Sequence, residues 1–185
     1  MITKKEQLLN SALELFVTKG FHGASTNNIA KNAWVSNGIL FHYFKTKEEL
    51  IIGLYIKIKE ELIAFLESQN QNISNPELRI KEILIWSILW WIENKNKYYF
   101  IQQVHFSPYI LEIPPFIQET HMQLYIEMVE NAKDEKIIKD LPLYLILSIL
   151  SGQINAICDY LLSKKTYTKQ DIEEWVDMVW GIIGK

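Results

Sequence analysis

The sequence predicts an all-α protein of about nine helices, because three observations agree. Only seven glycines and five prolines occur among its 185 residues, so few positions interrupt a helix. Long stretches place apolar residues three and four positions apart, which is the spacing of one helical face. Serine, threonine or proline stands before several of these stretches, where helices commonly begin.

The first helix is expected from about Thr3 to Lys19. Its inward face consists of Leu9, Ala12, Leu13 and Phe16. Gly20 follows directly and suits the left-handed conformation that ends many helices.

Two short helices are predicted next, within residues 24–47. Ser25 and Ser36 each offer a hydroxyl to the unpaired amides of a first helical turn. Only three or four residues separate the two helices, as in a helix-turn-helix motif. The apolar residues of the stretch are spaced to form a small shared core: Ile29, Ala30, Ala33, Val35, Leu40 and Phe44. The residues left outside offer hydrogen bonds, aromatic rings and positive charge, which suits phosphates and base edges: Thr26, Asn27, Asn37, Ile39, His42, Tyr43 and Lys47.

The remaining elements follow from caps and prolines. Thr46 with Glu49 forms a capping box that opens a long helix to about Ser68, and this helix joins a DNA-binding domain over residues 1–46 to a larger domain over 47–185. After a polar break over 69–75, Pro76 suits the first position of the next helix. Further helices are expected over 97–106, 114–132 and 142–163, and Thr168 with Asp171 predicts a cap for a last helix that ends near Gly184.

The charge distribution agrees with a DNA-binding N-terminal domain. The formal net charge of the chain is −3, but no acidic residue stands between Glu14 and Glu48, whereas four lysines do. Residues 1–50 contain six lysines and four glutamates, and residues 51–185 contain 13 basic and 18 acidic residues. The positive field is therefore confined to the segment that holds the two short helices.

From Leu8 to Leu50 the chain resembles the N-terminal domain of the TetR family of bacterial transcriptional regulators, through LLNSALELFVTKGFHGAS, TNNIAKNA and VSNGILFHYFKTKEEL. The resemblance implies a homodimeric repressor that binds a palindromic double-stranded operator, and a helical C-terminal domain whose small ligand releases the DNA. It also implies a recognition helix at 36–44, with phosphate contacts from Thr26, Tyr43 and Lys47 and base contacts from Asn37, Ile39 and His42. The full set of expected DNA-binding residues is Ser25, Thr26, Asn27, Ser36, Asn37, Gly38, Ile39, Phe41, His42, Tyr43 and Lys47.

Three residues depart from the pattern of that family. Trp34 stands where glycine is most common, so either the backbone is adjusted there or Trp34 is strained and lies near the DNA. Asn37 replaces a common lysine and offers an amide suited to adenine. Phe41 replaces a common tyrosine and lacks its hydroxyl. These departures bear on the operator sequence and not on the binding mode.

Residues 86–128 are rich in aromatic and sulfur-containing side chains, with almost no alanine or glycine between them. For any single one of these residues, packing in a core is the simplest interpretation. Their density nevertheless predicts a cavity for a small apolar or aromatic ligand, with a few polar groups to orient it. The expected ligand-binding residues are Trp86, Trp90, Phe100, Gln103, His105, Phe106, Met122, Tyr125 and Asn155.

The last two helices are expected to form a homodimer surface. Leu145, Ile149, Gly152, Ala156 and Tyr160 follow one another about one turn apart, and the small residues among them permit close approach of a second helix. The last helix adds Ile172, Trp175, Val176, Val179, Trp180 and Ile183. The alternative is that all of these residues pack within one chain.

Composition limits other functions. A single cysteine, Cys158, excludes a disulfide framework within the chain, and no set of convergent metal ligands or cofactor motif is visible. Charged residues interrupt the N-terminus at once. The longest apolar segment, 141–162, contains polar residues and is better interpreted as a buried helix than as a membrane span, so we expect a cytoplasmic protein.

The sequence also bears on two other functional classes. An enzyme is disfavoured, because no catalytic triad, paired carboxylates or phosphate loop is visible. A DNA-binding adaptor without a small ligand, acting through a protein partner, remains open, and a filled C-terminal core would favour it.

Overall fold

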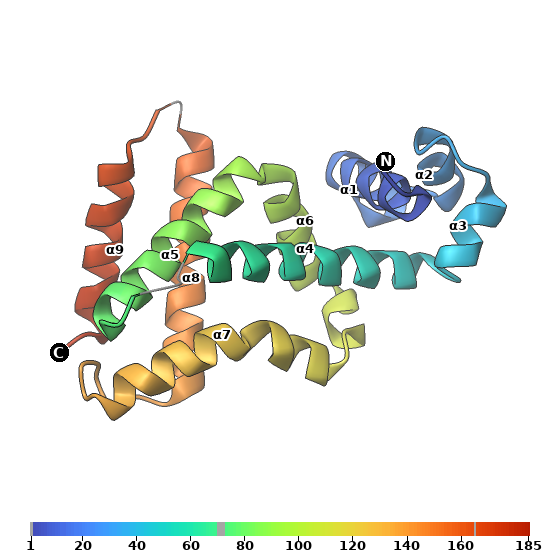
Figure 1. Ribbon diagram of the computed structural model, residues 1–185. Coiled ribbons are helices and arrows are strands. Elements are labelled where there is room, and N and C mark those ends of the chain that lie inside the picture. The colour runs from blue at the N-terminus through green and yellow to red at the C-terminus, as the bar shows by residue number, and fades with distance from the viewer. Residues whose placement is uncertain (1, 70–72, 165) are drawn as a thin grey trace. The chain divides into compact units, whose positions relative to one another are not determined.

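The computed structural model describes residues 2–69, 73–164 and 166–185, and these residues form nine α-helices and one short 3-10 helix (Figure 1). The β-structure in this part of the chain is one isolated bridge between Ile138 and Gly184. The all-α prediction is therefore confirmed. Packing divides the chain into a first unit, Met1–Glu60 with Lys95–Gln118, and a second unit, Glu61–Asn94 with Glu119–Lys185.

The first unit is assembled around α1 (Lys4–Gly23), which packs against α2 (Thr26–Asn32), α3 (Asn37–Tyr43) and α6 (Lys95–His105). Leu8, Ala12 and Phe16 of α1 are fully buried in its core. The buried Ser11 hydroxyl donates a 2.8 Å hydrogen bond to the carbonyl of Ile29, which fixes α2 against α1. The unit also contains the first part of α4 (Lys47–Gln69) and η1 (Pro108–Glu112).

The end of α1 differs slightly from the sequence prediction. Gly20 has φ 69°, a left-handed value, so the regular helix does break where glycine was expected to end it. One more turn follows the kink and extends the element to Gly23. Phe21 in this turn is thereby placed against other rings of the unit.

Four aromatic rings join α1 to α6 and η1 inside the first unit. The Phe16 ring stacks on Phe100 with centroids 6.0 Å apart, and Phe21 meets Phe100 edge-to-face at 5.9 Å. Tyr109 of η1 contacts Phe21 in the same way at 5.1 Å. Edge-to-face pairs of this kind add to the free energy of burial, so movement of α6 or η1 is opposed by contacts with α1.

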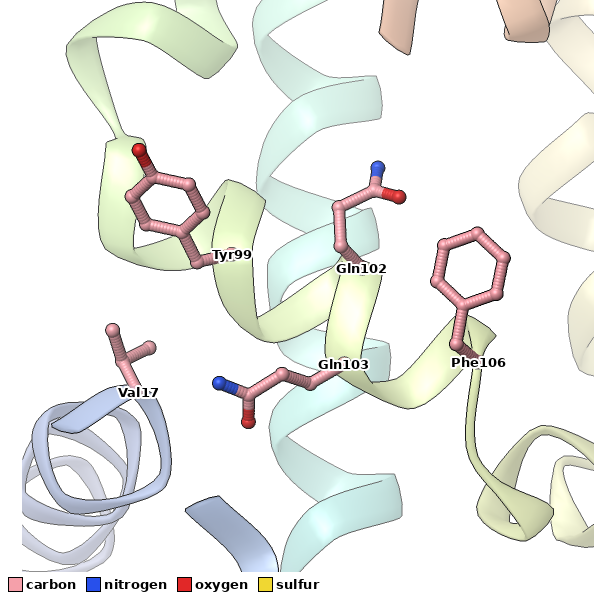
Figure 2. A pocket seen from close by; sticks show the side chains of 5 residues that line it. All are labelled: Val17, Tyr99, Gln102, Gln103 and Phe106. Carbon is pink, nitrogen blue, oxygen red and sulfur yellow. The ribbon is translucent and has the colours of Figure 1, made fainter. Parts of the chain in front are cut away.

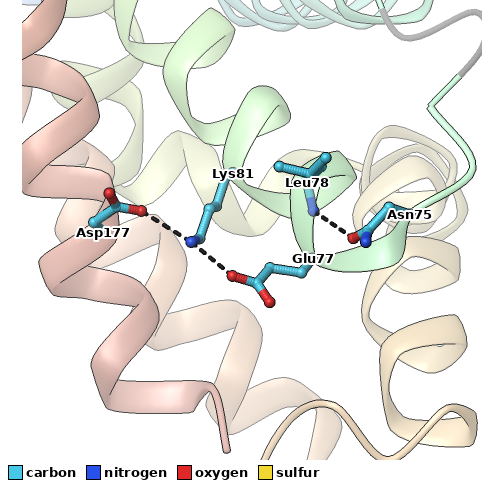
Figure 3. Close-up of polar contacts among 5 residues, drawn as sticks. All are labelled: Asn75, Glu77, Leu78, Lys81 and Asp177. Carbon is cyan, nitrogen blue, oxygen red and sulfur yellow. Dashed lines mark hydrogen bonds and ion pairs between the residues drawn. The ribbon is translucent and has the colours of Figure 1, made fainter.

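The second unit contains α5 (Pro76–Glu93), α8 (Leu143–Ser163), α9 (Lys169–Ile183) and most of α7 (Pro115–Asp134). The helix α5 packs against both α8 and α9, and these two also contact each other. Figure 3 shows the Lys81 ammonium of α5 between two carboxylates, 2.7 Å from Glu77 and 2.9 Å from Asp177 of α9. The same view shows the Asn75 side chain accepting a 3.0 Å hydrogen bond from the Leu78 amide, which caps the start of α5 at Pro76 as the sequence predicts.

The predicted caps explain why most helix boundaries were anticipated. Thr46 accepts from the Glu49 amide at 3.1 Å, and Glu49 reaches back to the amide of Lys45 at 2.6 Å. Thr168 and Asp171 form the capping box of α9. The helix expected over 97–106 begins at Lys95, and η1 was not predicted. Residues 70–72 of the expected polar break lie outside the described residues, and the domain boundary expected between residues 46 and 47 stays a prediction.

Candidate nucleic-acid interface

The two short helices of the first unit begin as the sequence predicts. The Ser25 hydroxyl accepts from the Asn28 amide at 3.2 Å, and the Ser36 hydroxyl accepts from the Ile39 amide at 3.4 Å. Both serines are exposed, and each holds a helix N-terminus toward solvent. Helix N-termini carry unpaired amides and a partial positive charge, which favours nearby phosphates.

The residues expected to contact DNA lie in α2 and α3, at their caps and at the start of α4, and all of them are exposed or partly exposed. Asn27, Asn37 and His42 are exposed, whereas the apolar partners Ile29 and Leu40 are fully buried. The exposed members of the expected set are Ser25, Asn27, Ser36, Asn37, Gly38, Phe41, His42 and Tyr43; Thr26, Ile39 and Lys47 are partly exposed. The inward and outward patterns derived from spacing therefore agree with the observed burial, while DNA contact by each residue stays a prediction.

Two side-chain hydrogen bonds organise this face. The Asn37 amide nitrogen donates to the side-chain oxygen of Asn27, so the first turns of α3 and α2 are joined. The Lys47 ammonium donates to the carbonyl of Phe21, directly after the kink in α1. Sequence reasoning had no signal for the second contact, because it depends on the extra turn beyond Gly20.

The residue that follows α3 packs closely against α4. The ring of Phe44, which is 5% exposed, lies where a Cβ on Gly53 would be 2.9 Å from its nearest carbon. Only glycine leaves room for the ring at this distance. The position of α3 is therefore tied to the first turns of α4.

The turn between α2 and α3 contains a left-handed residue. Trp34 has φ 56°, and its amide and that of Val35 donate to the carbonyls of Lys31 and Ala30 at 3.1 and 3.0 Å. This pair of bonds is the Schellman arrangement that ends many helices. Of the two possibilities that the sequence left open, the backbone is not adjusted to spare Trp34, and the residue occupies the conformation usually taken by glycine.

A groove of about 640 Å³, open to solvent, lies between α1 and α6 inside the first unit. Its lining consists of Val17, Tyr99, Gln102, Gln103 and Phe106, and Figure 2 shows the Gln103 amide extending from α6 toward Val17 on α1. The Gln103 Oε1 atom is buried and accepts no hydrogen bond from the described residues. A groove of this size is within the range of small-molecule sites, and a buried amide oxygen favours a ligand that donates a hydrogen bond.

The expected ligand-binding residues divide between the two units. Gln103 and Phe106 line the groove; His105 is exposed beside them, and Phe100 is fully buried among the rings of the first unit. The others belong to the second unit: Trp86, Trp90, Met122, Tyr125 and Asn155. There Trp90 packs edge-to-face on Trp91 at 4.8 Å, and burial raises the pKa of Tyr125 to about 12. Val17, Tyr99 and Gln102 were not anticipated, because sequence spacing does not show which helix covers α6.

One face of α8 and α9 carries exposed apolar side chains. Ile146, Leu150 and Cys158 of α8 are buried, whereas Leu145 and Tyr160 on its other face are each 46% exposed. A Cβ built on Gly152 meets nothing within 4 Å. In α9, however, Ile172, Val176, Val179 and Ile183 pack inside the unit, so the apolar area that they were expected to add to a dimer surface is absent, and Met178 and Ile182 are exposed instead.

By length and composition alone, α8 is the one helix in the described segments that could cross a membrane, and 28% of its most apolar window is buried. The sequence led us to expect a buried helix. The structure corrects this for one of its two faces, because the small and apolar row at its surface is not covered by the chain itself.

Comparison with known proteins assigns the first part of the chain. Residues 8–54 match the model of the bacterial regulatory proteins of the TetR family. Over 70 residues the chain is 34% identical to the fatty acid metabolism regulator protein of Bacillus subtilis, covering 38% of this chain and 34% of that protein. The aligned segment covers between about a third and two fifths of the length of such curated relatives.

Solved structures match over the whole length. A TetR-family transcription regulator from Shewanella sp. PV-4 superimposes with a TM-score of 0.88 at 24% identity, covering 99% of both chains. The fatty acid degradation regulator FadR from Bacillus halodurans gives a TM-score of 0.81 at 18% identity, covering 95% of this chain and 94% of that one. These TM-scores show a shared fold, with an N-terminal helix-turn-helix domain and a helical C-terminal domain. Residues 8–54, which match the TetR-family model, are therefore similar to the N-terminal domain of that family.

Proposed function

We propose that this chain, with its TetR-family DNA-binding domain, is a cytoplasmic transcriptional regulator and not an enzyme, which binds a palindromic operator as a homodimer. The observation that carries the proposal is the exposed face of α2 and α3. Capped helix N-termini, amides and aromatic rings point to solvent there, and no acidic residue occurs between Glu14 and Glu48. Neutral donors that position a protein on phosphates, beside amides that recognise base edges, are the two parts of sequence-specific binding.

The proposed dimer contact is the exposed row on α8. Ser148, Gly152 and Ala156 are small and exposed, and Leu145 and Tyr160 flank them with apolar surface. Small residues let two helices approach closely, and the apolar flanks supply area to bury. A two-fold dimer presents two recognition helices, and binding to successive major grooves on one side of B-DNA needs a separation of about 34–36 Å.

The proposed regulatory ligand is a small apolar or aromatic molecule with a hydrogen-bond donor. The α1–α6 groove supports this proposal, since Phe106 and Tyr99 offer aromatic surface and the buried Gln103 Oε1 atom accepts no hydrogen bond from the described residues. The relatives named for fatty acid metabolism and fatty acid degradation favour an acyl compound among such ligands. Because α1 forms one wall of the groove and also packs on α2 and α3, a ligand that prefers one position of α1 changes DNA affinity by its differential binding energy. We expect the bound state to release DNA.

Selection from random-sequence DNA tests the regulator proposal. The recovered sites should be inverted repeats whose half-site centres lie about one helical turn apart, bound by two chains. A pool that shows no enrichment over successive rounds would contradict sequence-specific binding. The recovered site then serves for the ligand test.

Thermal shift and DNA release, measured together, test the groove. Acyl amides and alcohols of increasing chain length should raise the melting temperature and lower DNA affinity, and Gln103→Leu should weaken both effects. Gln123→Leu is the matched control, because Gln123 is an exposed glutamine outside the groove. DNA binding that persists with every compound, with no thermal shift, would favour the adaptor without a small ligand.

A further inference from the structure

Trp34 combines two features that packing does not explain. Its φ of 56° lies in the left-handed region, where Cβ crowds the following carbonyl and glycine or asparagine is favoured. Its side chain is 95% exposed, so burial of the indole does not offset this strain. A large aromatic residue is therefore held in an unfavourable backbone conformation with its ring in solvent.

The location of Trp34 limits what the ring can meet. It lies two residues before Ser36, the cap of α3, and one turn after the exposed Lys31. The nearest acidic residues along the chain are Glu14 and Glu48. Strained residues gather at functional sites, and this one stands between the two helices of the candidate DNA face.

We propose that Trp34 contacts the DNA backbone: the indole Nε1–H donates to a phosphate oxygen, and the ring lies against the adjacent deoxyribose. This inference rests on the proposed DNA-binding function and adds a residue to it. A tryptophan offers a single donor and a flat apolar face, which matches a phosphate next to a sugar. Backbone contacts from neutral donors set the position of a protein on DNA without recognising sequence.

The uncharged indole gives the contact a distinct signature. A lysine that neutralises a phosphate releases counterions, so its loss reduces the salt dependence of binding. Loss of the indole removes no charge. Trp34→Gly should therefore weaken binding by on the order of tenfold, to the selected site and to random DNA alike, with the same dependence on salt concentration.

The Trp34→Gly variant distinguishes the loss of a DNA contact from a loss of folding stability. Glycine relieves the left-handed strain and removes no buried surface, so the melting temperature should rise by about 2–4 °C. Higher stability with lower DNA affinity is the expected result. Leu111→Ala is the matched control, since Leu111 is 87% exposed in the same unit but lies in η1; its affinity should equal that of the wild type.

Intrinsic fluorescence reports the contact directly. Trp34 is the one tryptophan of the six in the sequence that belongs to the first unit. The emission that Trp34→Gly lacks should shift or be quenched when DNA is added to the wild type. If Trp34→Gly binds DNA with the affinity of the wild type, and the wild-type emission does not change when DNA is added, the inference is overturned and the proposed function is left intact. A wild type that binds no DNA would instead contradict the proposed function itself.

Discussion

The side chain of Asn37, at the start of α3, donates a hydrogen bond to the side chain of Asn27 in α2. Both residues are exposed and both belong to the set expected to contact DNA. The bond uses one hydrogen of the Asn37 amide and leaves its second hydrogen and its oxygen for a base edge. Asn27 therefore orients the residue best suited to recognise adenine, and the two residues should act together.

A double-mutant cycle on DNA binding measures this coupling. Asn37→Ala should reduce the preference for one base pair by about 1–3 kcal/mol, and Asn27→Ala should lose part of the same preference because Asn37 is no longer oriented. The double variant should then be weaker by less than the sum of the two, by about 0.5 kcal/mol or more. Strictly additive losses would show that the two side chains act independently.

Lys47 is expected to contribute to DNA binding through its charge. Its ammonium is held at the Phe21 carbonyl, so it is positioned at the start of α4 without being neutralised. Lys47→Met keeps the apolar stem and removes the charge, and the slope of log affinity against log salt concentration should fall by about one unit for each chain that contacts the DNA. Lys95→Met, at the start of α6, is the control and should leave the slope unchanged. An equal slope in wild type and Lys47→Met would contradict a phosphate contact.

Gly152 offers a test of the dimer surface that spares the fold of one chain. Nothing lies within 4 Å of a Cβ built on it, so Gly152→Arg introduces no clash inside the chain and raises helix propensity. In the proposed dimer the arginine would face its mate, and mass measured by light scattering should change from that of two chains to that of one. Gly181→Arg is a control on α9, where the built Cβ is equally unobstructed and the small-residue row of α8 is untouched. A dimer that survives Gly152→Arg would place the interface elsewhere.

Lys59 of α4 should make stability depend on pH. Burial lowers its pKa to about 8 from the ordinary value of 10.5, because the charged ammonium loses solvation on folding. Below pH 8 the Lys59 side chain is protonated in both the folded and the unfolded chain. Burial of its charge then destabilises the folded state in full. As pH rises above 8 the folded chain releases the Lys59 proton first, so the Lys59 contribution to the free energy of unfolding should increase between about pH 8 and 10.5.

Denaturant unfolding of Lys59→Met isolates this contribution. The variant should be more stable than the wild type at pH 7, by about 1 kcal/mol or more, and the difference should shrink toward pH 9. Comparison with the wild type at each pH is needed because burial also raises the pKa of Cys158 to about 12, which lowers stability as pH rises above about 9. A difference independent of pH would show that the Lys59 ammonium remains solvated.

The sequence predicted most of this fold because local signals mark most of its helices. Ser25, Ser36 and Pro76 all begin helices where their chemistry suggested, and the spacing of Ile29 and Leu40 identified the buried face. The departure of Trp34 from glycine was visible from the family pattern alone; its left-handed backbone agrees with the expected strain, while its proximity to DNA stays a prediction.

What the sequence did not reveal depends on contacts between distant segments. The groove needs Val17 of α1 beside Gln103 of α6, and periodicity within either helix does not report that they meet. The density of aromatic residues in the sequence also did not distinguish residues that line a cavity from residues buried in the core, since Phe100 and Trp90 are buried while Phe106 is 83% exposed. Likewise, α9 showed enough apolar residues for an interface, but its packing against α5 and α8 accounts for most of them.

We propose above that the exposed face of α2 and α3 recognises DNA. Fluorescence anisotropy with labelled DNA from immediately upstream of the gene, at two salt concentrations, tests it most directly, with a scrambled duplex of equal length for comparison. We expect two chains bound per inverted repeat, with an affinity that falls steeply with salt and exceeds the affinity for the scrambled duplex by at least about a thousandfold. Equal affinity for both duplexes would contradict recognition of this DNA, and the absence of binding to either at low salt would contradict the DNA-binding function.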